Sequence, residues 1–386
     1  MQIWLHMVRL NWIQKIESAW KEKSVVWLMG VRRSGKTTLA KSIEHMQYFD
    51  CELPRVRNQL KDPEDFFLNL TSKICVLDEI HRIENASEVL KIAADHFPKI
   101  KILATGSSTL AASKRFKDTL TGRKRTVFLT PLNSEDQKSF KNENLNYRLL
   151  RGGLPPMFIS KSFPEEDFKE WVDSFWAKDI QELFNIEKKS AFLKFFELVA
   201  LQSGGLFVAQ NFSAPCGVSH TTIANYLNVM EQTQTAYVIR PFHNNKAKEI
   251  ITAAKVYFFD TGFINYFMGL TSNNETQKGH LWEHFVLNEL LSHFDKEDIH
   301  YWRDKAKHEI DFVIKKRGRF PMGIECKWNQ NEFQTKNLKA FRSIHKDGVN
   351  VLIASDIQHI RTKNISGFDV VLYPLSKIDQ LQELIK

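Results

Sequence analysis

Short apolar runs, each followed by small or polar residues, recur along the first third of the chain. They cover residues 24–29 (SVVWLM), 73–78 (KICVLD) and 101–105 (KILAT). Continuous apolar runs of this length are typical of strands buried in a parallel sheet. After the first run, a loop that contains glycine leads into a segment whose apolar residues have helical spacing. This pattern predicts an α/β domain, which we place at residues 1–150.

The middle of the chain has helical spacing. Residues 165–205 are rich in Phe, Leu and Lys, and residues 209–243 predict a helix, a turn near Gly217, a second helix and a strand. Ser219 suits the N-cap of the second helix, whose apolar face carries Ile223, Leu227 and Met230. We therefore predict a helical lid and a winged helix-turn-helix within residues 151–270.

The second helix of such a motif can enter the major groove of DNA. Its outward positions include His220, Thr221 and Asn225, which can contact phosphates or base edges. No Arg or Lys accompanies them on this helix. DNA reading and a role as a lid or protein contact therefore stay equally open.

Apolar and polar residues alternate in two segments of the last third of the chain, as they do in strands. In HEIDFVIKK (308–316) and GIECKW (323–328), apolar and polar side chains point to opposite faces with a period of two. The connecting RGRFPMG predicts a hairpin that brings Asp311 and Glu325 onto one face. A hairpin with one face in water would give the same pattern. We assign residues 271–386 to a third domain, and we expect the whole chain to be α/β.

The helix expected at residues 279–295 carries one carboxylate on its apolar face. Its polar stripe is formed by His284, Asn288, Ser292 and Asp295. Glu283 aligns instead with the apolar residues at helical spacing. A carboxylate packed toward a core is costly unless it meets a cation, a donor or a metal. We expect its partner to be a divalent ion or Lys327.

The loop after the first strand, Gly30-x-x-x-x-Gly35-Lys36-Thr37, matches the P-loop pattern in full. Its glycines let the backbone close around phosphate, and amides at the helix N-terminus face the anion. Lys36 is expected to reach the β- and γ-phosphates, and the Thr37 hydroxyl to hold Mg²⁺. The loop therefore predicts a nucleotide site.

Three further segments support this site. The run at 73–78 ends in Asp78 and is followed by Glu79, which are expected to bind Mg²⁺ and to polarise the attacking water. Thr105 and Ser107 follow the next strand and are expected either at the γ-phosphate or as caps of a helix. Arg123 is either a finger on a neighbouring subunit's nucleotide or part of a basic loop.

In this order, GVRRSGKTT, LDEIH, ATGSS and LTGR resemble the AAA-type P-loop ATPases of a prokaryotic group with a C-terminal restriction-endonuclease-like region. RGGLPPMF (151–158) and AKVYFFDTG (254–262) are similar to the linking segments of that group, so the resemblance spans most of the chain. It implies ATP hydrolysis and a ring or other homo-oligomer. It also implies ATP contacts from the loop residues Gly30, Arg33, Ser34, Gly35, Lys36, Thr37 and Thr38.

A helix glutamate, a strand aspartate and Glu-x-Lys on the next strand resemble the PD-(D/E)xK nucleases. The resemblance implies that Asp311 and Glu325 bind Mg²⁺ or Mn²⁺, and that Glu283 completes or orients the metal shell. Lys327 would position or activate the attacking water. A degenerate site that only holds DNA is the alternative.

Composition narrows the partners. The 386 residues carry a formal charge of +9, which favours an anionic partner such as nucleic acid, and we expect DNA before RNA. The four cysteines are scattered without a C-x-x-C pair, which argues against a zinc ribbon or a disulfide framework. We find no signal-peptide pattern and no apolar run of ~18 residues. We therefore expect a cytoplasmic protein without a membrane partner.

Together these features predict an ATP-hydrolysing, DNA-binding protein whose C-terminal domain cleaves DNA with a divalent metal. The alternative is an ATP-driven DNA-binding or signalling protein whose nuclease-like domain is not catalytic. A small-molecule kinase is disfavoured because Asp78, Glu79 and the ATGSS segment suit activation of water.

Overall fold

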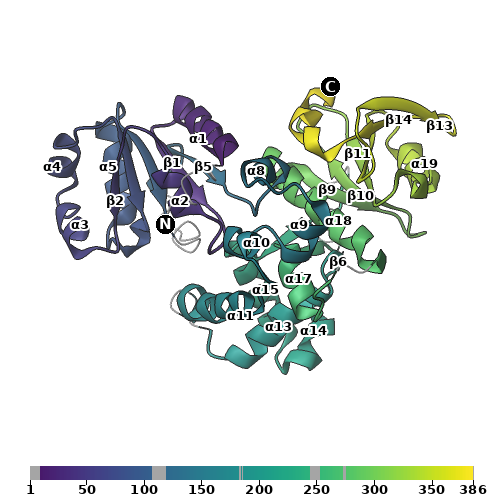
Figure 1. Cartoon of the computed structure of the whole chain (residues 1–386), viewed down its shortest axis with the longest axis horizontal. Helices are drawn as coiled ribbons and strands as arrows, with labels where there is room; N and C mark the ends of the chain where they lie inside the picture. Colours follow the sequence, from purple (N-terminus) through teal and green to yellow (C-terminus); the bar gives the residue numbers. More distant parts are fainter. Residues whose placement is uncertain are drawn as a thin grey trace.

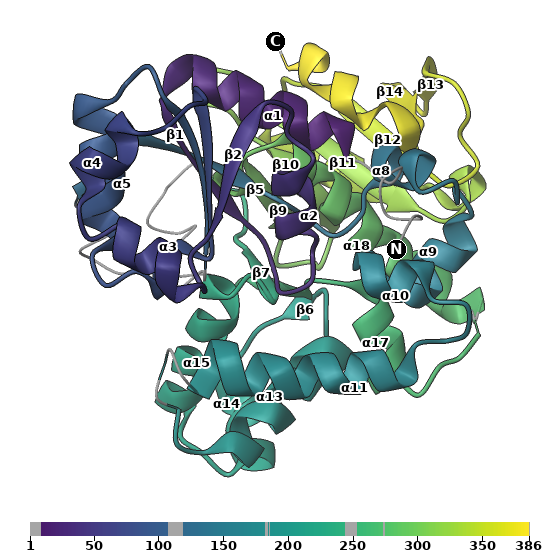
Figure 2. The same ribbon diagram turned by 60° about the vertical axis from the view of Figure 1, so that its left-hand side comes forward.

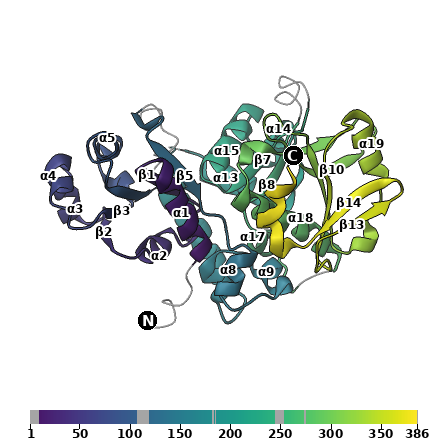
Figure 3. The ribbon, with the colours of Figure 1, turned by 90° about the horizontal axis from the view of Figure 1, so that it is seen from above.

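A computed structural model describes residues 9–106, 119–181, 184, 186–243, 253–272 and 275–385. Figure 1 shows an N-terminal α/β part in purple and blue, a helical middle part in teal, and a C-terminal part in green and yellow built on a second sheet. Seen from above, the N-terminal and C-terminal parts lie at opposite ends with the middle part between them (Figure 3). The expected α/β class is confirmed.

The N-terminal sheet is parallel throughout, with the strand order β2-β3-β4-β1-β5. Its strands are β1 (Val25–Met29), β2 (Met46–Asp50), β3 (Ile74–Asp78), β4 (Lys101–Thr105) and β5 (Lys124–Phe128). The helices around it are α1 (Leu10–Glu22), α2 (Lys36–Lys41), α3 (Pro54–Gln59), α4 (Pro63–Leu68), η2 (Ile80–Arg82) and α5 (Ala86–His96). Trp27 and Leu77 belong to the core on one face, and Trp12 and Leu28 to the core on the other. Because both faces are covered, its central strands are the continuous apolar runs seen in the sequence.

Glycines let two distant segments interlock where the middle part begins. The chain reaches this point through α8 (Ser134–Ser139), α9 (Leu145–Arg151) and α10 (Pro155–Ile159). The Asp260 carboxylate accepts hydrogen bonds from the amides of Gly153, at 2.6 Å, and Gly262, at 2.9 Å. Gly152 has a φ of 78°, and a Cβ there would lie 1.9 Å from Asp260 Oδ1. Only glycine fits this contact, which fixes the RGGLPPMF segment against the AKVYFFDTG segment.

The middle part contains the helices that the sequence predicts. Its elements are α11 (Glu165–Ser174), the π-helical segment η3 (Phe175–Gln181), α13 (Lys189–Leu201), β6 (Gly205–Leu206), α14 (Ala209–Cys216), α15 (His220–Gln232), β7 (Ala236–Ile239), β8 (Lys255–Phe258) and α17 (Thr261–Phe267). Helices α11, α13, α14 and α15 gather below the two large sheets (Figure 2), and β6, β8 and β7 form a small antiparallel sheet. Ser219 caps α15 by accepting a hydrogen bond from Thr222 N at 3.1 Å. His220, Thr221 and Asn225 are exposed, as predicted.

The C-terminal part is a mixed sheet with the order β13-β14-β12-β11-β10-β9. Its elements are α18 (Glu275–His293), η4 (Lys296–Asp298), β9 (Ile299–Arg303), β10 (Glu309–Ile314), β11 (Met322–Lys327), η5 (Gln330–Glu332), α19 (Lys336–Ile344), β12 (Asn350–Ala354), β13 (Arg361–Ile365), β14 (Phe368–Tyr373) and η6 (Leu375–Leu384). β10 and β11 form the predicted antiparallel hairpin, with Phe312 opposite Ile324.

The structure excludes the alternative of a water-exposed face for this hairpin and corrects one expectation about its side chains. Helix α18 packs against β11 and α19 against β10, so the hairpin has no face in water. The register of β10 against β9 shifts between Ile310 and Val313, and such an irregularity re-aims side chains. Ile310 therefore packs with Val313, and not with Phe312 and Ile314 as strict alternation predicts.

The middle and C-terminal parts share one hydrophobic core, which includes Trp171, Trp282 and Phe312. The polar stripe expected on α18 exists, but His284, Asn288 and Ser292 are buried. Asn288, for example, donates a hydrogen bond to Pro131 O at 3.2 Å. α18 is thus enclosed on its polar side as well. No helix in the described part of the chain is long and apolar enough to cross a membrane.

Candidate functional site

The P-loop joins β1 to α2 and needs its glycines for space and conformation. A Cβ on Gly30 would lie 2.6 Å from Leu129 O, and Gly35 has a φ of 94°. The Lys36 ammonium donates hydrogen bonds to two carbonyls of the loop, those of Gly30 at 2.9 Å and Val31 at 3.0 Å. The loop therefore curves around the charged end of Lys36.

Lys36 lies among charged side chains. Burial lowers the pKa of Lys36, while the nearby carboxylates of Glu79, Asp179 and Asp78 act in the opposite direction. Thr37 and Thr38 line the same cleft as Lys36. A hydroxyl and an ammonium are thus presented together, as a bound triphosphate with its metal requires.

Asp78 is buried at the carboxyl end of β3, where its carboxylate is held from two sides. It accepts hydrogen bonds from Tyr48 OH, at 2.6 Å, and from the Thr105 hydroxyl. Burial, together with the Asp78 carboxylate, raises the pKa of Tyr48. Thr105 was predicted to lie at this site, whereas Tyr48 was not. Tyr48 lies on β2, and only the parallel pairing of β2 with β3 brings it close.

Glu79 adopts a left-handed conformation, with a φ of 53°, directly after β3. Its amide donates to Thr105 Oγ1 at 3.0 Å, and its carboxylate lies 3.1 Å from His81 Nδ1. Burial alone would raise the pKa of Glu79, but the hydrogen bond from His81 and the charge of Lys36 lower it. An ionised carboxylate is the form that can accept a proton from water. The DEIH segment contains this histidine, although its spacing alone did not indicate a partner for Glu79.

A cleft of about 400 Å³ lies over the P-loop and has walls from two parts of the protein. One wall includes Lys36 and Glu79, and the other includes Pro155, Phe175 and Asp179 of the middle part. The middle part therefore closes the nucleotide site.

Two arginines inside the P-loop hold the middle part in place. Arg32 pairs with Asp179, and Arg33 with Glu170, both at 2.5 Å. Trp171 Nε1 donates to Arg32 O at 3.0 Å. Burial raises the pKa of Asp179, although the Arg32 guanidinium opposes this shift. Arg33, expected to contact ATP, thus points to α11.

Arg123 lies at the start of β5 and pairs with Asp95 of the same chain at 2.7 Å. This contact raises the pKa of Arg123 and lowers that of Asp95. β5 is parallel to β1, so its first residue lies at the sheet edge opposite the P-loop. The structure does not bring Arg123 to its own chain's nucleotide cleft. Ser107 lies outside the described residues.

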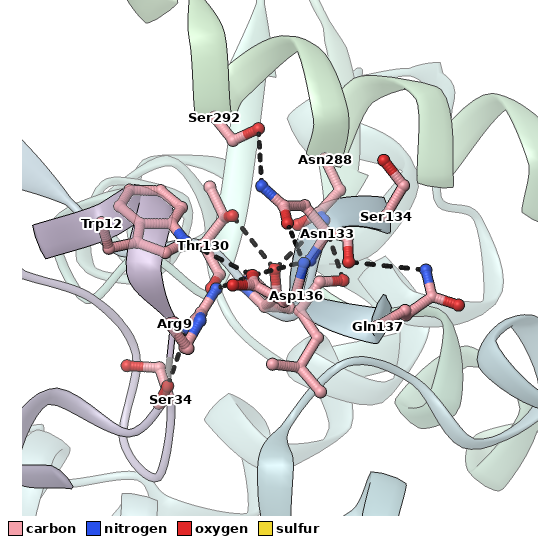
Figure 4. Close-up of polar contacts among 12 residues, drawn as sticks. Arg9, Trp12, Ser34, Thr130, Asn133, Ser134, Asp136, Gln137, Asn288 and Ser292 are labelled. Atoms are coloured by element: carbon pink, nitrogen blue, oxygen red, sulfur yellow. Dashed lines mark hydrogen bonds and ion pairs between the residues drawn. The ribbon is translucent and has the colours of Figure 1, made fainter. Parts of the chain in front are cut away.

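A buried polar network joins the P-loop to α18 (Figure 4). Arg9 donates to Ser34 O of the P-loop at 3.1 Å and to Thr130 O at 2.9 Å, and it pairs with Asp136 at 2.5 Å. Asp136 and Asn133 form the capping box of α8. Asn133 donates in turn to the Ser292 hydroxyl of α18 at 3.4 Å. The nucleotide loop is therefore connected to the helix that carries Glu283.

In the C-terminal part, the hairpin assembles a carboxylate–lysine cluster, which we define as Glu283, Asp311, Glu325 and Lys327. Lys327 Nζ lies 2.9 Å from Glu325 Oε2 and 3.6 Å from Asp311 Oδ2. Asp311 Oδ2 also accepts a hydrogen bond from Cys326 N at 2.7 Å. The predicted approach of Asp311, Glu325 and Lys327 is confirmed.

Glu283 has partners that the sequence analysis missed. Its Oε1 accepts a hydrogen bond from Tyr257 OH at 2.5 Å and lies 3.3 Å from Lys255 Nζ. Both partners belong to β8 of the middle part. The structure thus pairs Glu283 with Lys255, where a divalent ion or Lys327 was expected. Lys255 and Tyr257 stand two residues apart in an apolar strand, the same alternation that marked Glu325 and Lys327.

The carboxylates of the cluster are crowded. Burial, with the charge of Glu283, raises the pKa of Asp311 despite Lys327 and Lys255. Burial, with the charge of Asp311, raises the pKa of Glu325 to about 8. Within the part of the chain that the structure describes, no hydrogen-bond partner of normal geometry meets the buried Glu325 Oε1, although the Asn337 side chain opposes the rise in the pKa of Glu325. These features fit a divalent cation at Asp311 and Glu325, since Mg²⁺ is commonly held by one or two carboxylates and completed by water or phosphate. Among the described residues, no group of three or more His, Cys, Asp or Glu side chains is placed to hold a metal.

The fold and the nucleotide site define a class of protein. Residues 22–137 match the family model of an AAA domain, so the chain carries a P-loop ATPase domain of the AAA type. Residues 142–274 and 278–378 match two models described as Domain of unknown function (DUF8612) and Domain of unknown function (DUF4143). Neither description names a nuclease.

Two similar proteins, both named as uncharacterized proteins, match most of the chain. One from Mycobacterium tuberculosis is 28% identical over 81% of this chain and 72% of its own. Another from Methanocaldococcus jannaschii is 25% identical over 93% of this chain and 85% of its own. Among solved structures, AMPPCP-bound DnaA from Aquifex aeolicus matches 58% of this chain and 88% of its own, at 13% identity and a TM-score of 0.30. A STAND ATPase with a tetratricopeptide repeat sensor from Pyrococcus horikoshii matches 73% of this chain and 45% of its own, at 14% identity and a TM-score of 0.28. Scores this low carry no information on substrate or partner.

Proposed function

We propose that this protein hydrolyses ATP at the P-loop and uses the nucleotide cycle to control a C-terminal part that binds and cleaves nucleic acid. The observation that carries the ATPase half is the convergence of Lys36, Thr37 and Glu79 on one cleft, beside the buried Asp78 carboxylate at the end of β3.

In this reaction Lys36 turns from the loop carbonyls to the β- and γ-phosphates, and Glu79 accepts a proton from the attacking water. His81 holds Glu79 in position. The Thr37 hydroxyl and the Asp78 carboxylate supply hard oxygen atoms that suit Mg²⁺. When bound, Mg²⁺ neutralises charge on the phosphates.

Phosphate release by the full chain tests this half. Lys36→Ala is expected to abolish turnover, whereas Lys21→Ala, an exposed lysine on α1, serves as the matched control and keeps it. Unchanged turnover in Lys36→Ala would refute the proposed ATPase.

We also propose a homo-oligomer in which Arg123 of one subunit leaves Asp95 and reaches the nucleotide of its neighbour. Arginine fingers supplied in this way stabilise transition-state charge. Mixing Lys36→Ala and Arg123→Ala chains gives the test. Each variant alone should be inactive, and mixing should restore part of the turnover; two inactive variants that stay inactive when mixed would argue against shared sites.

For the C-terminal half we propose DNA as partner. The order of α14, α15 and the β7–β8 pair supports a winged helix, and His220, Thr221 and Asn225 are exposed on α15. Cleavage would take place at Asp311 and Glu325, which hold a divalent cation, with Lys327 orienting the attacking water. The cation, Mg²⁺ or Mn²⁺, would stabilise charge on the leaving oxygen.

Cleavage of linear duplex and single-stranded DNA, with Mg²⁺ or Mn²⁺ and with or without ATP, tests this half. Asp311→Asn is expected to lose cleavage, and Asp369→Asn, an exposed aspartate on β14 of the same sheet, to keep it. Loss of ATP dependence in Lys36→Ala would show coupling. Cleavage that survives in Asp311→Asn would place the chemistry elsewhere.

The second candidate is an ATP-driven DNA-binding or signalling protein whose C-terminal part grips nucleic acid without cutting it. Two observations favour it. No group of three metal ligands occurs among the described residues, and Glu283 is already occupied by Lys255. DNA binding by wild type and Asp311→Asn alike, with cleavage by neither, would decide for this candidate.

A further inference from the structure

The middle part contributes a buried cation to the carboxylate–lysine cluster. Lys255 is only 5% exposed. It lies on β8, the central strand of the small sheet, where it pairs with Leu206 on one side and Ile239 on the other. Its backbone is therefore fixed from both sides, and its side chain leaves the middle part and enters the C-terminal part.

The contacts of Lys255 are with carboxylates of the C-terminal part. Its Nζ lies 2.6 Å from Glu309 Oε1 and 3.3 Å from Glu283 Oε1. Burial alone would lower the pKa of Lys255, but the charges of Glu283, Glu309 and Asp311 outweigh it and raise the pKa. The charged end of the side chain therefore lies between the helix carboxylate and the hairpin.

The positions of the two parts relative to each other support this contact. Pro241, just after β7, forms a parallel bridge with Tyr301 of β9. Tyr301 OH donates to Ala253 O at 2.5 Å, two residues before Lys255. Backbone contacts thus hold β8 against the C-terminal sheet, and the approach of Lys255 to Glu283 is built into the fold.

The contacts divide the carboxylates of this region between two lysines. Glu283 and Glu309 lie against Lys255, whereas Asp311 and Glu325 lie against Lys327. Lys255 thus already lies at Glu283, where a second divalent ion would have to bind.

We infer that Lys255 is a built-in cation that takes the place of a second divalent ion at Glu283, so that this cluster binds a single divalent cation, at Asp311 and Glu325. The inference rests on the proposed metal site. It assigns Glu283 to Lys255 and Tyr257, and not to the metal shell, and it makes the site a composite of the middle and C-terminal parts. Lys255 acts here as a positioning residue that sets the number of metal ions.

Mn²⁺ titration of the nucleotide-free full chain, followed by calorimetry and by electron paramagnetic resonance, tests the inference. Wild type should bind one ion that Asp311→Asn abolishes. Lys255→Gln should bind a second ion, seen as doubled stoichiometry and as dipolar coupling between two Mn²⁺ ions, while Lys255→Arg should keep one. A Lys255→Gln chain that binds one ion with unchanged affinity overturns the inference.

A second measurement does not depend on the folding of any Lys255 variant. In an otherwise wild-type chain, Glu283→Gln should change Mn²⁺ affinity by less than about threefold, because Glu283 is not a ligand. A loss of more than tenfold would make Glu283 a metal ligand and overturn the inference. Failure of the proposed function looks different: in that case wild type and Asp311→Asn bind Mn²⁺ alike.

Discussion

The ion pair of Arg9 with Asp136 gives a quantitative test of the network that joins the P-loop to α18. The two side chains are 4% and 1% exposed and meet at 2.5 Å. Asp136 also accepts hydrogen bonds from Trp12 Nε1 at 3.3 Å and from Asn133 N at 3.1 Å. Removing one partner of a buried ion pair leaves an uncompensated buried charge, which costs about 3–5 kcal/mol.

We expect Arg9→Met and Asp136→Asn each to lower the free energy of opening of this interface by about 3 kcal/mol. The double variant should cost little more than either single change, because no buried charge is then left without a partner. The coupling energy between the two positions should therefore reach about 2–3 kcal/mol. Arg9→Met should also weaken ATP binding more than Asp136→Asn does, because only Arg9 contacts Ser34 O of the P-loop.

Native-state hydrogen exchange of α1 and α8, read by mass spectrometry, measures the opening free energy of this region directly. It avoids treating a chain with several parts as a single two-state unit. A pair of exposed residues of α1, Lys21 and Glu22, serves as the matched control. Effects of Arg9→Met and Asp136→Asn that add to within about 0.5 kcal/mol would refute the reasoning.

Three further predictions follow from single sites. Glu79→Gln should lower ATP turnover at least about 100-fold while ATP binding persists, because the proton acceptor is lost; a turnover within threefold of wild type would contradict this. Glu289 is fully buried, and burial raises its pKa to about 8 against the hydrogen bonds from Ser134. In the unfolded chain the pKa of Glu289 is about 4.3, so at higher pH this side chain ionises first in the unfolded state only. The contribution of Glu289 to the free energy of unfolding therefore falls as the pH rises from about 4.5 to 8. In Glu289→Gln this loss should shrink by at least about 2 kcal/mol in denaturant unfolding compared at pH 5 and pH 8.5; identical pH profiles would exclude Glu289 as its cause. Gly152→Ala should destabilise the protein by more than about 2 kcal/mol in a thermal melt, because its Cβ would meet Asp260 at 1.9 Å and its φ is 78°. Gly269 has a similar φ of 67° but open space around it, so Gly269→Ala measures the backbone strain without the clash.

Most of the nucleotide site could be predicted from the sequence because its residues are close along the chain. Gly30, Lys36 and Thr37 belong to one loop, and Asp78 with Glu79 ends one strand. Local spacing fixes such groups once the strands are parallel. Tyr48 could not be predicted, because it reaches Asp78 only through the pairing of β2 with β3.

The same distinction applies to the carboxylate–lysine cluster. Alternation with a period of two placed Glu325 and Lys327 on one face, and the hairpin brought Asp311 to them. Lys255 is 28 residues away from Glu283 and 72 from Lys327 along the chain. No local pattern couples residues that far apart, because their approach depends on how β8 is held against the C-terminal sheet.

The sequence by itself determined the periodicities, and with them the parallel sheet, the P-loop and the Glu-x-Lys strand, because those depend on neighbours within a few residues. Only the tertiary structure decided which charges meet. In the folded chain the polar stripe of α18 is buried, Arg9 donates a hydrogen bond to the P-loop, and Glu283 pairs with Lys255. A buried charge is stable only beside a partner, and the packing of whole helices and strands decides which partner is near. That packing is a property of the folded chain and not of any short segment.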